Sequence, residues 1–220
     1  MTPDNQQNEK NSQPGRYGTD GWKNYIERGE TYEWLRFGKT KKARQRSHRE
    51  IGMVVDFLQS LPQNQVVLDA PSGMGRFCEI IREQGHIPIA VDSNSGRIKD
   101  TYNRLDPPIP AVHADIMNLP FLDNAFDAVI CFRLLHHLNA DLVMTVLQEI
   151  SRISKHALIT FYSQNTWKFY RKHLTGKTPQ GYYYRFNWIL KASREAGWKL
   201  SPQQPKYSFF ESLHAIWLTK

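Results

Sequence analysis

The sequence predicts an α/β fold with one mostly parallel sheet and helices on both of its faces. Apolar, β-branched runs alternate with amphipathic helical segments across residues 49–197, which is the order expected for a parallel sheet. The clearest run, residues 66–68, is Val-Val-Leu and has the character of a central buried strand. With 220 residues, the chain is long enough for one domain with a substantial core.

The predicted elements follow in chain order. Apolar residues at helical spacing predict an amphipathic helix over residues 43–61. The first strand ends at Asp69, a second ends at Asp92, a short third ends at Asp115, and a fourth spans residues 126–132. A helix follows the fourth strand, the fifth strand covers residues 157–161, and a helix over residues 184–196 is stopped by Gly197.

A tight glycine turn follows the first strand, in the stretch VVLDAPSGMGRF at residues 66–77. Gly73 and Gly75 let the backbone turn sharply and let a ligand approach without meeting a Cβ. A dinucleotide site needs a third glycine, and Cys78 stands at that position. Asp69, four residues before Gly73, would meet a pyrophosphate with negative charge, so it suits the ammonium of a methionine moiety better.

Two further acids end the next two predicted strands. Asp92 lies 23 residues after Asp69, near the spacing of about 20 residues for an acid that holds ribose hydroxyls. Asp115 ends the third strand. Each acid alone has an ordinary structural role available, as a turn residue or a helix cap. Three acids at three successive strand ends beside a glycine loop favour cofactor binding.

Over residues 66–161 the chain resembles the class I S-adenosylmethionine-dependent methyltransferases, in the branch that includes quinone-biosynthesis enzymes. The resemblance implies a Rossmann-like fold with a seven-stranded, mostly parallel sheet, and residues 199–202 and 213–219 as its closing antiparallel pair. It also implies S-adenosyl-L-methionine as the cofactor. The family loop often has three glycines, and Pro71 replaces the first of them here.

The resemblance also assigns the cofactor contacts. Asp69, Gly73 and Gly75 would hold the methionine end, and Asp92 would hold the ribose hydroxyls. Asp115, with the backbone of Ile116, would bind the adenine amine. The remaining expected cofactor contacts are Ala70, Ser93 and Phe132.

Three residues after the fourth strand are candidates for work on the methyl acceptor. His136 and His137 could remove a proton, since imidazoles titrate near neutral pH, although packing or capping of the next helix is the stronger alternative. Arg133 could bind an anionic acceptor, and a plain surface arginine is the alternative. In some quinone methyltransferases this position resembles E-x-x-E-H and holds a metal. Both carboxylates are absent here, so the sequence predicts no catalytic metal.

The predicted domain organisation is simple. Residues 1–18 are expected to be a disordered tail, and residues 19–220 one methyltransferase domain. Within it, residues 19–61 are expected to form covering helices, and the irregular residues 163–183, with Gly176, Pro179 and Gly181, a lid-like insertion. The sequence shows no signal peptide, and its two cysteines suit free buried thiols, so we expect a cytoplasmic protein with peripheral membrane contact as an option.

Charge is unevenly distributed along the chain, whose net charge is +8. Residues 61–150 hold 6 basic and 11 acidic side chains, whereas residues 151–200 hold 10 basic and 1 acidic. Basic and aromatic residues are dense in the segments expected to cover the acceptor. They favour a small-molecule or lipid-like acceptor that is anionic or aromatic, and a solvated surface is the structural alternative.

Two other functions remain open. The basic excess also suits an RNA-modifying methyltransferase, although the amino-methylation motif and an RNA-binding module are missing. A non-catalytic scaffold that only binds the cofactor is the third possibility. The sequence leaves the acceptor atom and the oligomeric state open.

Overall fold

The structure is a computed structural model and describes residues 40–175, 181–204 and 212–220. A boundary between two compact units falls after His48, inside helix α2 (Lys41–Gln59), and residues 49–220 form the second unit. The predicted tail at residues 1–18 and residues 19–39 of the predicted covering segment lie outside the described residues.

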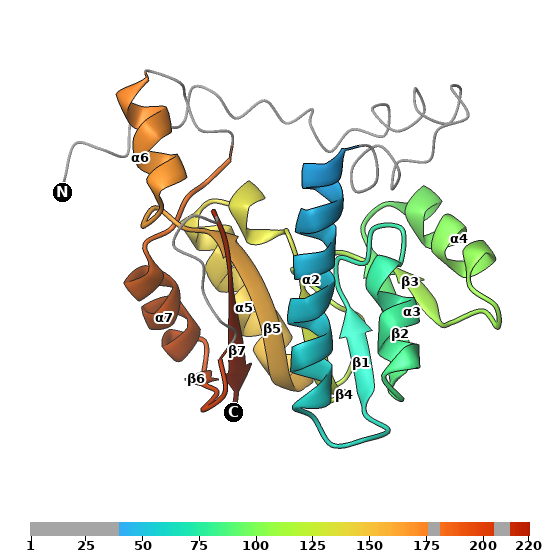
Figure 1. Ribbon diagram of the computed structural model, residues 1–220. Helices are drawn as coiled ribbons and strands as arrows, with labels where there is room; N and C mark the ends of the chain where they lie inside the picture. The colour runs from blue at the N-terminus through green and yellow to red at the C-terminus, as the bar shows by residue number, and fades with distance from the viewer. Residues whose placement is uncertain (1–39, 176–180, 205–211) are drawn as a thin grey trace. The chain divides into compact units, whose positions relative to one another are not determined.

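Seven strands form one sheet in the order β3-β2-β1-β4-β5-β7-β6 (Figure 1). They are β1 (Val66–Asp69), β2 (Ile87–Asp92), β3 (Ala111–His113), β4 (Phe126–Cys131), β5 (Ser154–Tyr162), β6 (Lys199–Leu200) and β7 (Leu213–Thr219). The first five strands are paired in parallel, and β7 is antiparallel to both β5 and β6. The predicted Rossmann-like sheet with its antiparallel closing strand is confirmed.

Strand order reverses between β1 and β4, which are adjacent in the sheet although β2 and β3 separate them in the chain. Open α/β sheets bind ligands in the crevice at such a reversal, outside the carboxyl ends of the strands. This rule predicts a ligand site beyond Asp69 at the end of β1 and Cys131 at the end of β4.

Helices cover both faces of the sheet because alternate strand residues point to opposite sides. On one face, α2 and α3 (Arg76–Glu83) contribute Leu58 and Ile81 to a core that includes Val67 of β1. On the other face, α5 (Ala140–Ile153) and α7 (Phe186–Glu195) pack against the neighbouring Leu68. Helix α4 (Ser95–Arg104) joins β2 to β3.

The structure differs from the sequence prediction at several element ends and in residues 163–183. Strand β3 ends at His113, two residues before Asp115, and β4 ends one residue before Phe132. Residues 163–183 are not irregular throughout, because they contain the helix α6 (Trp167–Leu174). Its first turn is capped by Thr166, whose Oγ1 accepts from the Phe169 N–H at 3.4 Å, and the helix-breaking Gly and Pro residues all follow its end.

None of the helices within the described residues is long and apolar enough to cross a membrane.

Candidate active site

The glycine loop links the end of β1 to the start of α3. Gly73 and Gly75 have φ angles of 59° and 71°, a left-handed conformation that other residues adopt at a cost. A Cβ on Gly75 would lie 2.5 Å from Cγ2 of Thr101, whereas one on Gly73 would meet none of the described residues within 4 Å. Gly75 is therefore required by packing against α4, and Gly73 borders open space that a ligand can use.

Asp69 is fully buried at the foot of this loop. Its Oδ2 accepts from Sγ of Cys78 at 3.6 Å, and its Oδ1 has no hydrogen-bond partner among the described residues. Burial raises the pKa of Asp69 to about 7, against a smaller lowering by the Cys78 hydrogen bond and the Arg76 charge. A buried carboxylate with an unpaired oxygen suits a cation placed beside it.

Asp92 fastens the loop to β2. Its Oδ2 accepts from the Gly73 N–H at 2.9 Å, and its Oδ1 accepts from the Asn94 N–H at 2.9 Å. Arg97 lies 3.8 Å from the same carboxylate, which is only 2% exposed. The side chain expected to hold ribose thus also sets the shape of the glycine loop. The neighbouring Ser93 is exposed, and its carbonyl pairs with Nε2 of His113 at 2.9 Å.

Asp115 is exposed in the loop that follows β3. Its Oδ1 accepts from the Met117 N–H at 2.9 Å, which leaves the side chain as an accessible acceptor at the loop surface. Ile116, the next residue, is buried. The exposure of Asp115 is compatible with the predicted contact to an adenine amine.

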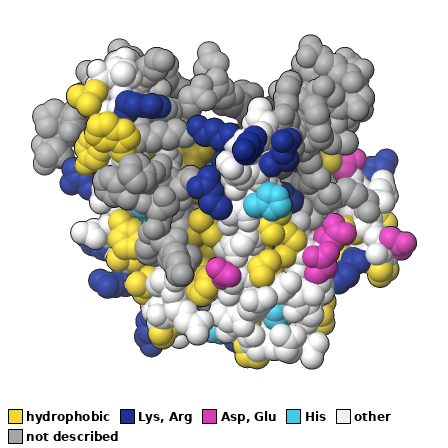
Figure 2. Space-filling model, viewed as in Figure 1, with side chains coloured by type: hydrophobic (Ala, Val, Ile, Leu, Met, Phe, Trp, Pro, Cys, Tyr) yellow, Lys and Arg dark blue, Asp and Glu magenta, His cyan; other side chains and the backbone are white. Residues whose placement is uncertain are grey.

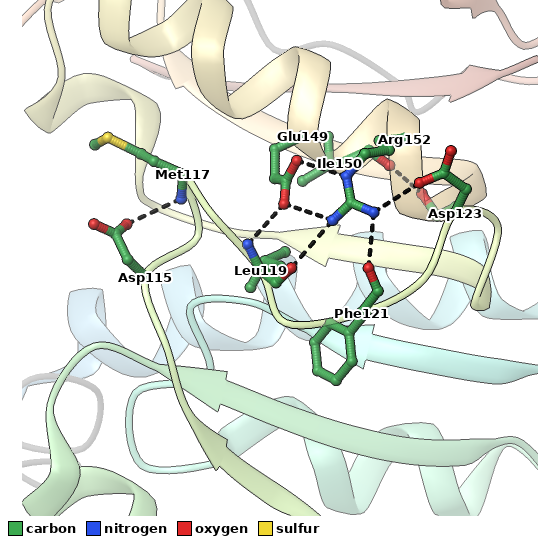
Figure 3. Close-up of polar contacts among 9 residues, drawn as sticks. Asp115, Met117, Leu119, Phe121, Asp123, Glu149, Ile150 and Arg152 are labelled. Atoms are coloured by element: carbon green, nitrogen blue, oxygen red, sulfur yellow. Dashed lines mark hydrogen bonds and ion pairs between the residues drawn. The ribbon is translucent and has the colours of Figure 1, made fainter.

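Arg152 and Glu149 of α5 hold this loop in place, as Figure 3 shows. Arg152 donates to the carbonyls of Leu119 and Phe121 at 3.1 and 2.7 Å and to Asp123 at 2.8 Å. Glu149 accepts from the Leu119 N–H at 2.7 Å and from Arg152 at 2.8 Å, and the Arg152 hydrogen bond is the largest cause of its lowered pKa. The sequence analysis missed both residues.

Arg133 comes shortly after β4 and lies beside Glu50 of α2 and Arg76 of α3. Nε of Arg133 donates to Oε1 of Glu50 at 3.1 Å, its Nη2 contacts the same oxygen, and Nη2 of Arg76 donates to Oε2 at 2.8 Å. Burial alone would raise the pKa of Glu50, but the hydrogen bonds and charges of the two arginines outweigh it and lower that pKa. Arg133 is thus no plain surface arginine.

Glu50 could not have been found from sequence spacing. It lies 26 residues from Arg76 and 83 residues from Arg133, and only the fold brings the three together. Phe132, one residue before Arg133, is 5% exposed and packs edge-on against Phe77, with ring centroids 4.9 Å apart.

The two histidines occupy a short 3-10 turn, η4 (Leu135–His137), in different environments. His136 is 3% exposed and stacks on Tyr162, with ring centroids 4.0 Å apart and an interplanar angle of 21°, whereas His137 is exposed. Asn139 caps α5 through its contact with the Leu142 N–H at 3.0 Å, so neither histidine side chain is that cap. The side chain of His136 is therefore packed against the fold, and His137 is the more accessible candidate for a base.

Part of the predicted lid is fastened to this turn. The Tyr182 N–H donates to the His136 carbonyl at 2.8 Å, and a Cβ on Gly181 would lie 2.5 Å from that oxygen. The Tyr184 N–H donates to the Tyr162 carbonyl at 2.8 Å. Residues 181–184 therefore form a fixed wall beside η4 and the end of β5.

Within the described ranges, no three His, Cys, Asp or Glu side chains cluster closely enough to hold a metal ion.

The sequence is similar to known methyltransferases. A family profile described as "Methyltransferase domain" matches residues 67–157. Two curated relatives are demethylmenaquinone methyltransferases. The one from Corynebacterium urealyticum is 34% identical over 95 residues, which cover 43% of this chain and 36% of that protein. The one from Renibacterium salmoninarum is 32% identical over 125 residues, which cover 57% and 48%. The match thus spans between a third and a half of these relatives.

Solved structures share the fold at low sequence identity. A Pyrococcus horikoshii protein superposes with a TM-score of 0.68 and 14% identity, covering 90% of this chain and 98% of that one. Magnesium protoporphyrin IX methyltransferase from Synechocystis, solved with bound S-adenosylhomocysteine, gives a TM-score of 0.66 and 15% identity, covering 78% and 82%. The chain shares the fold of these solved structures, and its residues 67–157 match the methyltransferase domain profile, so the resemblance inferred from the sequence is confirmed.

Proposed function

We propose that the protein transfers a methyl group from S-adenosyl-L-methionine to a small-molecule or lipid-like acceptor that is anionic or aromatic, without a catalytic metal. The observation that carries the proposal is the set of three acids beside two left-handed glycines, in which Asp69 and Asp92 end β1 and β2 and Asp115 follows the end of β3 by two residues. The methyltransferase domain match over the same residues supports it.

The residues fit this cofactor in charge and in space. In the part of the chain that the structure describes, Oδ1 of buried Asp69 has no partner and suits an ammonium, and no residue fills the space beside Gly73. The exposed Asp115 offers an acceptor to an amine. The bound cofactor supplies an activated methyl group on a sulfonium. The chain then has to hold the acceptor atom in line with that group, and such positioning can supply about 7–11 kcal/mol of the barrier.

On the acceptor side, Arg133 and the histidine turn stand past β4, across β1 from Asp92 and Asp115. His137 is exposed there and takes the proton if the acceptor must lose one, a contribution of about 10²–10⁴-fold. His136, packed on Tyr162, positions that turn. Arg133 stands where metal-holding relatives would need a carboxylate, and its positive charge supports the proposal of metal-independent transfer.

Names of relatives support an aromatic acceptor. Two are demethylmenaquinone methyltransferases, and a structure from Burkholderia thailandensis with a TM-score of 0.59 and 20% identity contains bound 1,6-didemethyltoxoflavin. Among the described residues, the buried Cys78 and Cys131 form no disulfide, which supports work in a reducing compartment such as the cytoplasm.

Calorimetry tests the cofactor half of the proposal. Asp92→Ala should weaken S-adenosylmethionine binding at least tenfold, about 1.4 kcal/mol, because it removes the expected ribose contact and frees the Gly73 N–H. Asp127→Ala is the control, since that carboxylate pairs with Lys155 away from the loop. Unchanged affinity in Asp92→Ala would refute the assigned site.

A labelled-methyl screen of cell extract tests the acceptor half. The extract is separated into lipid, small-molecule and RNA fractions, and transfer is measured with a chelator present. We expect label in the lipid or small-molecule fraction. Label that appears only after a divalent metal is restored would contradict the metal-free mechanism.

An RNA acceptor is the second candidate because of one surface feature. Lys and Arg side chains gather along the first half of α2, where Figure 2 shows them in dark blue, and they are exposed at Lys41, Lys42, Arg44, Arg46 and Arg49. A basic helix of this kind suits a polyanion. Label found in the RNA fraction would favour this candidate, and binding of the cofactor with no transfer to any fraction would favour a scaffold.

A further inference from the structure

Helix α6 carries large apolar side chains on a face that is open to solvent. Trp167, Tyr170 and Leu174 are 55%, 52% and 81% exposed. Together with the exposed Arg171 they stand three and four residues apart, which places all four on one side of the helix, here called the α6 stripe. Apolar residues at this spacing normally face a protein core, so their exposure marks a surface for a partner.

The other side of α6 packs on the fold. The ring of the half-buried Phe169 lies 5.2 Å from the Tyr183 ring, measured between centroids. The chain that leads into α6 is also held. The Gln164 N–H donates to the Tyr184 carbonyl at 3.0 Å, and Nε2 of Gln164 donates to the Tyr183 carbonyl at 2.9 Å. Thr166, which caps the helix, is fully buried. These contacts fix the α6 stripe in its outward orientation.

The sequence around the α6 stripe is basic. The helix contains Lys168, Arg171 and Lys172 and no acidic residue. Residues 150–194, which include it, contain no Asp or Glu. Figure 2 shows yellow apolar and dark blue basic side chains next to one another over α6. Basic helices with exposed Trp, Tyr and Leu lie in the plane of a membrane interface, where Lys and Arg meet anionic headgroups.

Other partners fit the α6 stripe less well. A stable protein interface buries roughly 800 Å² on each partner, from about 20–30 residues, whereas the stripe has four residues on one short helix. A second copy of the chain would also bring like charges together. RNA suits the charge, but Leu174, the most exposed of the apolar side chains, offers bases no ring on which to stack. A lipid surface uses both the charge and the aliphatic side chain.

We propose that α6 docks the protein on an anionic lipid bilayer, with Trp167, Tyr170 and Leu174 in the headgroup region and Arg171 beside the lipid phosphates. Trp and Tyr are enriched at this depth because their rings are apolar with a polar edge. Apolar burial and attraction to anionic lipid add together in such helices. The docking goes beyond the proposed methyl transfer and does not depend on it.

The docking helix is connected to the acceptor side of the proposed site. Phe169 of α6 contacts Tyr183, and the Tyr183 ring lies 5.3 Å from the ring of Tyr162, the last residue of β5. Figure 1 shows α6 in orange, beyond the end of β5. If the proposed function holds, a lipid-like acceptor would enter from the side that faces the bilayer.

Flotation of the full chain with lipid vesicles tests the docking. One set of vesicles is pure phosphatidylcholine, and the other contains about one third phosphatidylglycerol, which makes its surface anionic. The chain should bind the anionic vesicles roughly tenfold more tightly than the neutral ones, because basic residues of α6 meet negative headgroups. Binding should weaken as salt rises, because salt screens this attraction.

Leu174→Ala tests the apolar part of the α6 stripe. It should weaken binding to anionic vesicles about fivefold, because less apolar surface enters the bilayer. Leu122→Ala is the matched control and should bind like wild type. Leu122 is 84% exposed but precedes β4, whereas α6 follows the carboxyl end of the parallel strand β5, so the two lie at opposite edges of the sheet.

Arg171→Gln tests the basic part. Loss of one positive charge at an anionic surface should weaken binding about fivefold, and it should leave binding to neutral vesicles unchanged. Arg194→Gln, in the last turn of α7, makes the same change of charge on another exposed arginine and should bind like wild type. Thermal melts establish that each variant is folded.

Tryptophan fluorescence reports contact with the bilayer directly. Emission of the wild type should be quenched when the anionic vesicles contain bromine-labelled phospholipid. Trp167→Phe should keep most of the vesicle binding, because Phe also enters the interface, and should lose most of the quenching. A change of charge or of stability alone would not separate binding from quenching in this way.

Three results would overturn the proposal. They are a wild type that does not bind anionic vesicles, equal weakening by Leu122→Ala and Leu174→Ala, and quenching that Trp167→Phe leaves unchanged. Self-association or binding of an RNA oligonucleotide that Leu174→Ala weakens, without binding to vesicles, would assign the α6 stripe to a second copy or to RNA instead. The affinity for S-adenosylhomocysteine is measured without vesicles, and its absence would refute the proposed function and not the docking.

Discussion

Three carboxylates at the same edge of the sheet have three different environments. Asp69 is fully buried with one unpaired oxygen, Asp92 is buried but bonded to two backbone N–H groups, and Asp115 is exposed. Environment rather than residue type therefore divides the roles. An acid without N–H donors suits a cation, and an exposed acid suits a neutral amine.

Asp69 should make stability fall as pH rises. Because burial raises the folded-state pKa to about 7 from an ordinary 3.8, the folded chain keeps a proton between roughly pH 4 and pH 7 that the unfolded chain has released. This contribution is fully present below pH 4 and is lost as pH rises through 7. Urea unfolding at several pH values should show this slope in wild type and not in Asp69→Asn.

Ionisation of Asp69 should also govern the binding of S-adenosylhomocysteine. S-adenosylhomocysteine carries an ammonium, so its affinity should rise between pH 6 and pH 8 as Asp69 ionises, and calorimetry of Asp69→Asn should show a flat profile over this range. Parallel pH profiles for the two proteins would contradict the placement of the ammonium beside Asp69.

At the scale of elements, loops rather than strands carry the site, and helices on both faces fix those loops. Helix α4 packs against the glycine loop through Thr101, and α5 fixes the loop after β3 through Arg152. The strand ends supply the acids. Precise placement of the acids therefore depends on side chains that never touch a ligand.

The two loop glycines should respond differently to alanine. Gly75→Ala places a Cβ 2.5 Å from Thr101 Cγ2 in a left-handed residue, so it should lower the free energy of unfolding more than Gly73→Ala, for which the left-handed cost is about 1–2 kcal/mol. Thr101→Ser should recover part of the Gly75→Ala loss by removing that methyl. Gly73→Ala should mainly weaken S-adenosylhomocysteine binding, because its Cβ fills the open space.

Chemical denaturation and calorimetry on the same four proteins check both halves. Equal stability losses at the two positions would show that space beside Gly75 is not limiting. Unchanged affinity in Gly73→Ala would show that the cofactor does not approach the loop there.

Arg152→Ala should weaken cofactor binding from a distance. Loss of three loop contacts should lower S-adenosylhomocysteine affinity about 3–10-fold and stability by roughly 1–3 kcal/mol, with Asp115 itself intact. Lys191→Ala is the matched control, since its pair with Glu195 is exposed and lies on α7. An affinity equal to wild type in Arg152→Ala would mean that the loop holds its shape without this arginine.

At the scale of the whole molecule, elements that depend on local sequence patterns could be predicted, whereas contacts between residues far apart in the chain could not. The strand ends at Asp69 and Asp92 were predicted correctly, because apolar periodicity and glycine placement are local. The closing strand β7 was predicted correctly from the family resemblance. Helix α6 was missed because nearby Gly and Pro residues suggested an irregular segment. The Glu50–Arg133 contact was missed because a pairing across 83 residues leaves no pattern in sequence.

Charge is divided unevenly between two segments of the chain, and the charge of the acceptor decides how salt should act on the reaction. Residues 61–150 are net acidic and residues 151–200 strongly basic. A small acceptor with one carboxylate exchanges few counterions, so a plot of log KM against log salt concentration should have a slope near 1 or below. An RNA that neutralises several phosphates would give a slope of several units, because each contact releases about 0.7–0.9 counterions. This slope is measured from methyl transfer into the active extract fraction at about 50–300 mM salt, a range around physiological ionic strength. A steep slope that Lys41→Gln and Lys42→Gln reduce would show that the basic side chains of helix α2 contact nucleic acid. A shallow slope that these variants leave unchanged and that Arg133→Gln alters would support a small anionic acceptor.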